Sequence, residues 1–387
     1  MKTKPLILIV DDEPYNIDYL EQELDDLGYE TVSAANGKLA LALVAETKPD
    51  MILLDIMMPI MDGFEVLEKL NQVSAHRDIP VVVISAVTDM ESIVKGIELG
   101  ADDYLPKPFD PVLLQARLRA GLEKKRLRDI EKDYLRVLER EFEIGQEMQA
   151  GFLPQQLPVI DGWEIASFFQ PARNVAGDFY DVFKLPEAGK IGLIVGDVCD
   201  KGVGAALYMT LFRSLLRALF WAAGRLEDVD YAQKLVDVIA FTNTYICQIH
   251  NSASFATVFF GILDVDNGQL VYVSAGHDPP LLIKKGQIAA RIMPTGPAVG
   301  MFDEAEYQTA QLTLGGEEAL FLFTDGMLDS LNPDDLPFGQ DRFEDLIKEP
   351  SNNLGEKVAV IADQLSAFIG DANQFDDLTL VAVGKRP

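Results

Sequence analysis

The 387-residue sequence has few cysteines and few basic side chains for its length. Its two cysteines, Cys199 and Cys247, are too few for a disulfide framework, which favours a reducing compartment. Lys and Arg number 33 against 62 Asp and Glu, giving a net charge of −29. Because a protein with this net negative charge repels phosphate backbones and anionic lipid, we expect neither nucleic acid nor a membrane surface as a partner.

The sequence also lacks a long hydrophobic run. The N-terminal apolar stretch meets acidic residues too early for a signal peptide. The most apolar later segment, Leu211 to Ala223, is interrupted by Arg213 and Arg217. It therefore falls short of the roughly 18 apolar residues that a membrane span requires. These absences predict a cytoplasmic protein.

What remains is an ordinary globular composition, with 48% hydrophobic and 25% charged residues. The length suggests two or three domains. Residues 115–150 contain nine basic and eight acidic side chains and no proline, whereas the flanking parts are strongly acidic. This pattern predicts a helical connector between two acidic domains, and we place the divisions at residues 1–122, 123–152 and 153–387.

The first part alternates short apolar runs with helical periodicity. Leu6 to Val10, Met51 to Leu54 and Val81 to Ile84 are continuous apolar runs, as expected for strands covered by helices on both faces. This pattern predicts an α/β doubly wound domain with a five-stranded parallel sheet.

The third part separates apolar strands with turn signals such as Asn-Gly and Gly-Gly. Long helical patterns lie near residues 203–222 and 231–250, and another near residues 355–370. The pattern predicts an α+β domain in which two packed antiparallel sheets are flanked by helices.

Acidic residues follow the strands of the first part. Asp11, Asp12 and Asp55 fall at the carboxyl ends of predicted strands, where ligands bind in doubly wound sheets. Three converging carboxylates repel one another unless a hard cation lies between them, which indicates Mg²⁺. Ser85 and Lys107 end the fourth and fifth predicted strands and offer a hydroxyl and an ammonium group to an anion.

The segments VDDEP, LLDIMMPIMDG, ISA and YLPKPF occur in this order, and together they resemble response-regulator receiver domains. The resemblance implies that Asp55 accepts a phosphoryl group from a sensor histidine kinase or a phosphotransfer protein. It further implies that Asp12, Asp55 and the Met57 carbonyl hold Mg²⁺, with Asp11 acting largely through water. By the same resemblance, Lys107 and Ser85 bind the phosphoryl oxygens, and Tyr104 is a switch aromatic.

The third part carries a second acidic series, in AGDFYD, IVGDVCDKG, FTDGMLDS and FDDLTLVAV. Sites built from carboxylates alone select Mg²⁺ or Mn²⁺ over Zn²⁺. Several such groups could hold two ions that share a water and clamp a phosphoryl group. The alternative for any single Asp-Gly pair is a hairpin turn.

In series, these segments resemble the protein phosphatase 2C superfamily, and specifically its bacterial branch related to the stage II sporulation phosphatase. The resemblance implies that Asp178, Asp197, Asp325 and Asp376 hold two Mn²⁺ or Mg²⁺ ions. Asp197 would bridge the ions with help from the Val198 carbonyl, and Asp377 would support the site. The implied reaction is hydrolysis of phosphoserine or phosphothreonine without a covalent enzyme intermediate.

The sequence departs from that branch at Ala176, and at Cys199 and Asp200, without losing a ligand. Two further residues have open interpretations. Arg173 could meet the substrate phosphate or form a surface salt bridge. His277 could be a general acid or, more in keeping with its position before two prolines, be hydrogen-bonded within a turn. A Ser-His-Asp hydrolase has no support, because no Gly-x-Ser-x-Gly motif occurs.

The connector carries a seven-residue apolar repeat, which we call the seam: Leu127, Ile130, Tyr134, Val137, Ile144 and Met148. Glu141 falls on the same line of the helix and weakens the repeat. Such a repeat is typical of a short coiled coil and predicts a homodimer. The alternative is an amphipathic helix packed on its own domains.

These observations predict a response regulator whose output is a metal-dependent phosphatase. The resemblance implies as its substrate a small phosphoserine protein of the anti-anti-sigma type, in a partner-switching pathway. A non-catalytic adaptor is the alternative, although the four intact acids count against it. A transcriptional regulator is disfavoured by the acidic third part and by the lack of a basic recognition helix.

Overall fold

The computed structural model describes residues 4–73, 76–86, 90–187, 189–222, 230–250 and 254–386. The chain divides into two compact units, Met1–Glu139 and Arg140–Pro387. We describe each unit by itself.

The first unit is a parallel sheet with strand order β2-β1-β3-β4-β5. Its strands are β1 (Leu6–Val10), β2 (Glu30–Ala34), β3 (Met51–Asp55), β4 (Val81–Ala86) and β5 (Asp103–Lys107). The helices between them are α1 (Pro14–Asp26), α2 (Gly37–Thr47), α3 (Gly63–Gln72) and α4 (Met90–Glu98). Apolar cores form on both faces of the sheet, which explains why β1 is apolar along its whole length and β3 is apolar from Met51 to Leu54.

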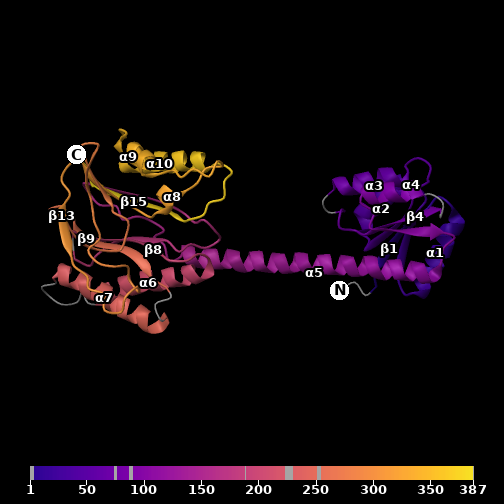
Figure 1. Cartoon of the computed structure of the whole chain (residues 1–387), viewed down its shortest axis with the longest axis horizontal. Helices are drawn as coiled ribbons and strands as arrows, with labels where there is room; N and C mark the ends of the chain where they lie inside the picture. The colour runs from indigo at the N-terminus through magenta and orange to yellow at the C-terminus, as the bar shows by residue number, and fades with distance from the viewer. Residues whose placement is uncertain are drawn as a thin grey trace. The chain divides into compact units, whose positions relative to one another are not determined.

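Helix α5 (Pro111–Ala150) begins in the first unit and ends in the second. Figure 1 shows it as one unbroken helix. The six seam side chains are between 43% and 68% exposed in the single chain. Pairing of the seam as a coiled coil stays a prediction.

The second unit contains two antiparallel five-stranded sheets, with strand orders β13-β10-β9-β8-β7 and β12-β11-β14-β15-β6. The strands of the first of these sheets are β7 (Phe179–Lys184), β8 (Lys190–Val198), β9 (Ala256–Asp264), β10 (Gln269–Ala275) and β13 (Ala310–Thr313). Those of the other sheet are β6 (Trp163–Gln170), β11 (Leu281–Lys284), β12 (Gln287–Arg291), β14 (Glu318–Phe323) and β15 (Leu378–Lys385).

Helices cover the outer faces of both sheets (Figure 1). They are α6 (Val203–Ala222), α7 (Tyr231–His250), α8 (Gly326–Asp329), α9 (Gln340–Lys348) and α10 (Leu354–Ile369). Helices α6 and α7 pack on the β7–β10 sheet, and α8 to α10 pack on the other. A third apolar core, which includes Phe259, Leu322 and Val381, fills the space between the sheets. The result is a four-layered helix–sheet–sheet–helix unit.

Within the described residues, α6 is the one helix long and apolar enough to cross a membrane by length and composition. Its Met209, Phe212 and Leu216 side chains are fully buried in the core against the β7–β10 sheet. The helix therefore belongs to the packed interior of the second unit.

The predicted fold class is confirmed in both parts. The expected helices near residues 203–222 and 231–250 coincide with α6 and α7, and the one near residues 355–370 begins one residue earlier. The connector differs in extent, because it continues without a break from the last helix of the first unit. The divisions at residues 122 and 152 stay a prediction.

Candidate functional site

The first unit gathers three carboxyl groups at the carboxyl ends of its central strands. Oxygens of Asp11, Asp12 and Asp55 lie within 4.8 Å of one another. Asp11 and Asp55 are buried, whereas Asp12 is exposed. Asp11 also accepts a hydrogen bond from Asn16 Nδ2 at 3.0 Å. An oxygen-only group of this kind fits a hard divalent cation.

Lys107 closes this group from the end of β5. Its Nζ lies 2.8 Å from Asp55 Oδ2 and 2.9 Å from Asp11 Oδ2. Burial raises the pKa of the Asp55 carboxyl, although the hydrogen bond from Lys107 opposes the rise. Burial would lower the pKa of Lys107, but its bonds to the two carboxylates raise it on balance. The ammonium therefore stays charged beside the oxygens where a phosphoryl group would be formed.

Three further receiver residues were predicted from the sequence: Met57, Tyr104 and Ser85. The Met57 backbone contacts the Asp55 carboxylate, while its side chain is exposed. Tyr104 is half-buried, and the Arg117 guanidinium lies 5.7 Å from the centre of its ring. Ser85 pairs with Pro106 in the sheet, but its side chain lies outside the described residues.

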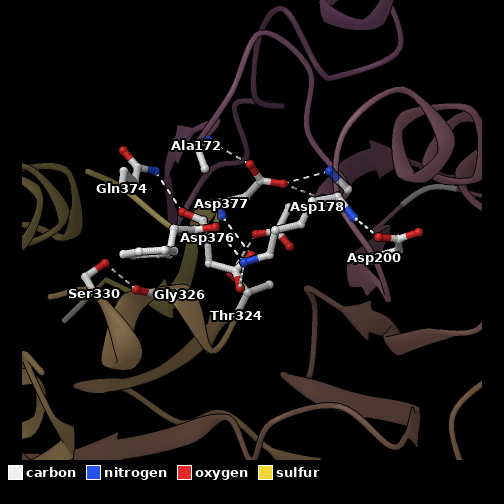
Figure 2. A network of polar contacts seen from close by, with 12 residues as sticks. Ala172, Asp178, Asp200, Thr324, Gly326, Ser330, Gln374, Asp376 and Asp377 are labelled. Atoms are coloured by element: carbon white, nitrogen blue, oxygen red, sulfur yellow. Dashed lines mark hydrogen bonds and ion pairs between the residues drawn. The ribbon is translucent and has the colours of Figure 1, made fainter.

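In the second unit, the four predicted acids come from segments far apart in the sequence. Figure 2 shows Asp178 and Asp376 close together, and the charges of Asp325 and Asp376 act on Asp197. Asp178 directly precedes β7, and Asp197 lies near the end of β8. Asp325 follows β14, and Asp376 comes just before β15. The antiparallel pairing of β14 with β15 places Asp325 and Asp376 on adjacent strand ends.

Asp178 is the most deeply buried of the four, at 1% exposure. One of its oxygens, Oδ2, accepts hydrogen bonds from Thr324 Oγ1 at 2.7 Å and from Thr379 Oγ1 at 2.5 Å. Both threonines are themselves buried in the sheet that faces Asp178. These two hydrogen bonds fix the orientation of the Asp178 carboxylate.

Asp377 fastens the loop that carries Asp178. Its Oδ1 accepts the Ala172 N–H and its Oδ2 accepts the Gly177 N–H, both at 2.7 Å (Figure 2). The Asp377 backbone in turn packs against Gly326, where an added Cβ would lie 2.0 Å from the Asp377 carbonyl oxygen. Only glycine fits after Asp325 for this reason.

A second side chain holds the same loop from the end of α5. Gln149 is buried and donates through Nε2 to the Ala176 carbonyl at 2.7 Å. Its Oε1 accepts the Ala176 N–H at 2.9 Å. The connector helix is thus bonded directly to the peptide two positions before Asp178, and the family departure at Ala176 is accommodated in a fully buried position.

The acids repel one another strongly. Burial, followed by the charge of Asp325, raises the pKa of Asp197 to about 7. Burial and the charge of Asp376 raise that of Asp325 to about 6. Burial and the charges of Asp197 and Asp377 also push the pKa of Asp178 well above its usual range.

Such a donor set fits divalent cations, which would relieve the repulsion among the carboxylates. Among the described residues, the receiver acids are the one group of three carboxyl groups within 4.8 Å of one another. The phosphatase-type acids are therefore spread more widely.

His277 and Asp278 lie in the loop that leads from β10 to β11, between the two sheets. His277 is buried, and its Nδ1 lies 3.0 Å from Thr257 Oγ1 on β9, a partner outside its own turn. Burial lowers its pKa to about 4, so the ring is neutral near pH 7. Asp278 lies close enough to Asp325 to raise the pKa of that residue.

Arg173 is exposed, and its Nη1 would lie 3.9 Å from a Cβ added at Gly202. It therefore lies beside the loop that follows Asp197, where an anionic ligand could reach it. Both of its interpretations stay open.

Sequence reasoning missed several residues that the structure brings to this site: Gln149, Lys201, Asp278, Thr324 and Thr379. The threonines could have been found, because they lie inside the FTDG and FDDLT segments. Gln149 carries no local signal, since its partner is a peptide group 27 residues away.

Two protein families match the chain. Residues 187–386 match "Stage II sporulation protein E (SpoIIE)", and residues 7–119 match "Response regulator receiver domain". Asp197, Asp325 and Asp376 lie inside the first match, and Asp178 lies just before it. Asp55 and Lys107 lie inside the second.

Individual relatives each match part of the chain. Protein IcfG of Synechocystis sp. is 37% identical over 261 residues, which are 63% of this chain and 41% of that protein. Response regulator PleD of Caulobacter vibrioides is 47% identical over 114 residues, 30% of this chain and 25% of its own length. The chain thus spans less than half the length of the curated relatives it matches.

Among solved structures, the SiaA-PP2C domain of Pseudomonas aeruginosa superposes with a TM-score of 0.55. It is 20% identical and covers 66% of this chain and 98% of that one. At this identity the likeness shows the fold of the second unit.

Proposed function

The chain belongs to the stage II sporulation protein E (SpoIIE) family, fused to a response-regulator receiver domain, and we propose that it is a metal-dependent protein serine/threonine phosphatase controlled by its receiver. The observation that carries this proposal is the meeting of Asp178, Asp197, Asp325 and Asp376 at one end of two packed sheets.

These residues would hold two Mn²⁺ or Mg²⁺ ions, with Asp197 between them and the Val198 carbonyl assisting. Bound ions of this kind lower the pKa of a water nucleophile and neutralise phosphoryl oxygens. The chain's own part is to hold the carboxylates rigidly. Thr324 and Thr379 orient Asp178, while Asp377 and Gln149 fix the loop that carries it.

The test is hydrolysis of a phosphoserine protein by the chelator-treated full chain, before and after addition of Mn²⁺. We expect activity only with the metal. Asp325→Asn should lower turnover by at least about 100-fold, because the ions generate the nucleophile. A matched control is Asp345→Asn, which removes an exposed carboxylate on α9 and should leave turnover unchanged. Metal-independent activity, or wild-type turnover in Asp325→Asn, would refute the assignment.

A non-catalytic adaptor is the second candidate. Carboxylates retained at all four positions favour catalysis, because a binding surface has no need of buried like charges at this cost. Failure of the purified chain to hydrolyse any phosphoserine or phosphothreonine substrate with Mn²⁺ would favour the adaptor.

The input is phosphorylation of Asp55 by a sensor histidine kinase or phosphotransfer protein, with Mg²⁺ held by Asp11, Asp12 and Asp55. The position of Lys107 between Asp11 and Asp55 supports this proposal, since its ammonium can neutralise a phosphoryl oxygen there.

Helix α5 is the proposed route from input to output. It leaves the receiver, exposes the apolar seam and ends one residue after Gln149, which binds the Ala176 peptide. We infer a homodimer paired along the seam, in which receiver phosphorylation changes the packing of α5. A shift of Gln149 would then move the loop that carries Asp178.

The substrate we propose is a phosphoserine or phosphothreonine on a cytoplasmic partner protein of the anti-anti-sigma type. The family match supports this choice of substrate class. Arg173, exposed beside Gly202, is the candidate cation for the substrate phosphate.

A further inference from the structure

Lys201 places a positive charge on one of the four acids. Its Nζ lies 2.8 Å from Asp376 Oδ2 and donates to the Phe375 carbonyl at 2.5 Å. In the described part of the chain, this is the one ion pair made by Asp178, Asp197, Asp325 or Asp376. The side chain therefore neutralises a carboxylate that a metal ion would also need.

The backbone around Lys201 is unusual. Asp200 has φ +82° although it is not glycine, and its Oδ1 accepts the Lys201 N–H at 2.8 Å. A left-handed conformation costs free energy for a residue with a Cβ, and such conformations cluster at functional sites. Here the turn between β8 and α6 brings Lys201 to Asp376, 175 residues further along the chain.

The Lys201 side chain can also move away from Asp376. Its side chain is 40% exposed and that of Asp376 33% exposed, so the pair is partly solvated. An ion pair of this kind contributes little net stability, and the lysine stem is flexible. A divalent ion held by the neighbouring carboxylates would carry twice the charge of the lysine and would displace Lys201 from Asp376.

We propose that Lys201 is an internal counter-cation, which occupies Asp376 in the metal-free protein and competes there with the divalent ion. The inference rests on the proposed metal site. The consequence follows from thermodynamic linkage. The free energy by which the Lys201–Asp376 pair stabilises the metal-free protein is lost when the metal binds, so the pair weakens metal affinity by that amount. A purely structural lysine would instead stabilise the metal-free and metal-loaded states equally.

The experiment uses the full chain stripped with a chelator. Both tryptophans, Trp163 and Trp221, lie in the second unit, so their fluorescence follows unfolding of that unit alone. Metal affinity is read from the dependence of unfolding on Mn²⁺ concentration. This readout needs no catalysis and is blind to ions bound by the receiver.

We expect Lys201→Met to unfold more easily without metal and to bind Mn²⁺ more tightly, by up to about fivefold for a pair of this exposure. Lys201→Arg, which keeps the charge, should gain no affinity. Lys284→Met is the matched control, because it removes a comparable ion pair with Glu318 at the start of β14. It should leave Mn²⁺ affinity unchanged.

Unchanged or weaker Mn²⁺ binding by Lys201→Met, with wild type responding normally, would overturn this inference and leave the phosphatase proposal standing. A tighter affinity shared by Lys284→Met would also overturn it. If wild-type protein shows no Mn²⁺-dependent stabilisation, this inference and the proposed metal site both fail.

Discussion

In the metal-free protein, Asp197→Asn is expected to stabilise the second unit while abolishing activity. Burial and the charge of Asp325 raise the pKa of Asp197 from 3.8 to about 7. Between these two values the native state binds more protons than the unfolded state. The free energy of unfolding therefore falls as the pH rises through this window.

The size of the effect follows from the same values. A difference of about three pKa units corresponds to about 4 kcal/mol at full ionisation, which is an upper limit because Asp197 is partly exposed. Asparagine carries no charge at any pH. We therefore expect the variant to exceed wild type by about 1–4 kcal/mol near pH 8, with the difference shrinking as the pH falls toward about 4.

The assay is urea unfolding of the chelated full chain between about pH 5 and pH 8, followed by fluorescence of Trp163 and Trp221. Mn²⁺ at about 1,000 times its Kd should cancel or reverse this difference in stability, since it adds about 4.1 kcal/mol to a protein that binds it. The control is Asp264→Asn. Lys190 holds the pKa of Asp264 below its usual value despite partial burial, so this substitution should destabilise the protein near neutral pH.

The reasoning is wrong if metal-free Asp197→Asn is less stable than wild type near pH 8. It is also wrong if the difference between the two proteins does not depend on pH. Either result would mean that burial and the neighbouring negative charges of the ionised Asp197 carboxylate do not destabilise the folded protein.

Three further predictions concern control by the receiver. Asp55→Asn should prevent labelling by a small-molecule phosphodonor and leave basal hydrolysis intact; labelling at the wild-type level would exclude Asp55 as the acceptor. Gln149→Ala removes two buried hydrogen bonds to Ala176 and should cost about 1–3 kcal/mol of stability in the second unit. The basal turnover of this variant, measured at saturating Mn²⁺, should fall. Unchanged turnover would show that the contact between α5 and the Ala176 peptide does not affect the site. Replacing Ile130, Val137 and Ile144 with lysine would place three charges in the paired seam. The molecular mass from light scattering should then fall, and the response of the activity to phosphodonor should vanish. If both match wild type, the seam is not the coupling element.

The sequence by itself determined the two domain types and most of their helices and strands. Continuous apolar runs such as Leu6 to Val10 identify strands buried on both faces, because local periodicity reports burial directly. The four phosphatase-type acids were found from motifs that end strands. Charge and apolar spacing also located the connector helix.

Only the tertiary structure decided how these parts are joined. Asp377 binds the Gly177 amide across 200 residues, Gln149 binds the Ala176 peptide, and Lys201 reaches Asp376. Backbone N–H and carbonyl groups are the same at every residue, so no local pattern tells which peptide a distant side chain will meet. The pKa values of Asp197 and Asp325 are likewise set by burial and by the spacing of charges, which exist only after the sheets have packed.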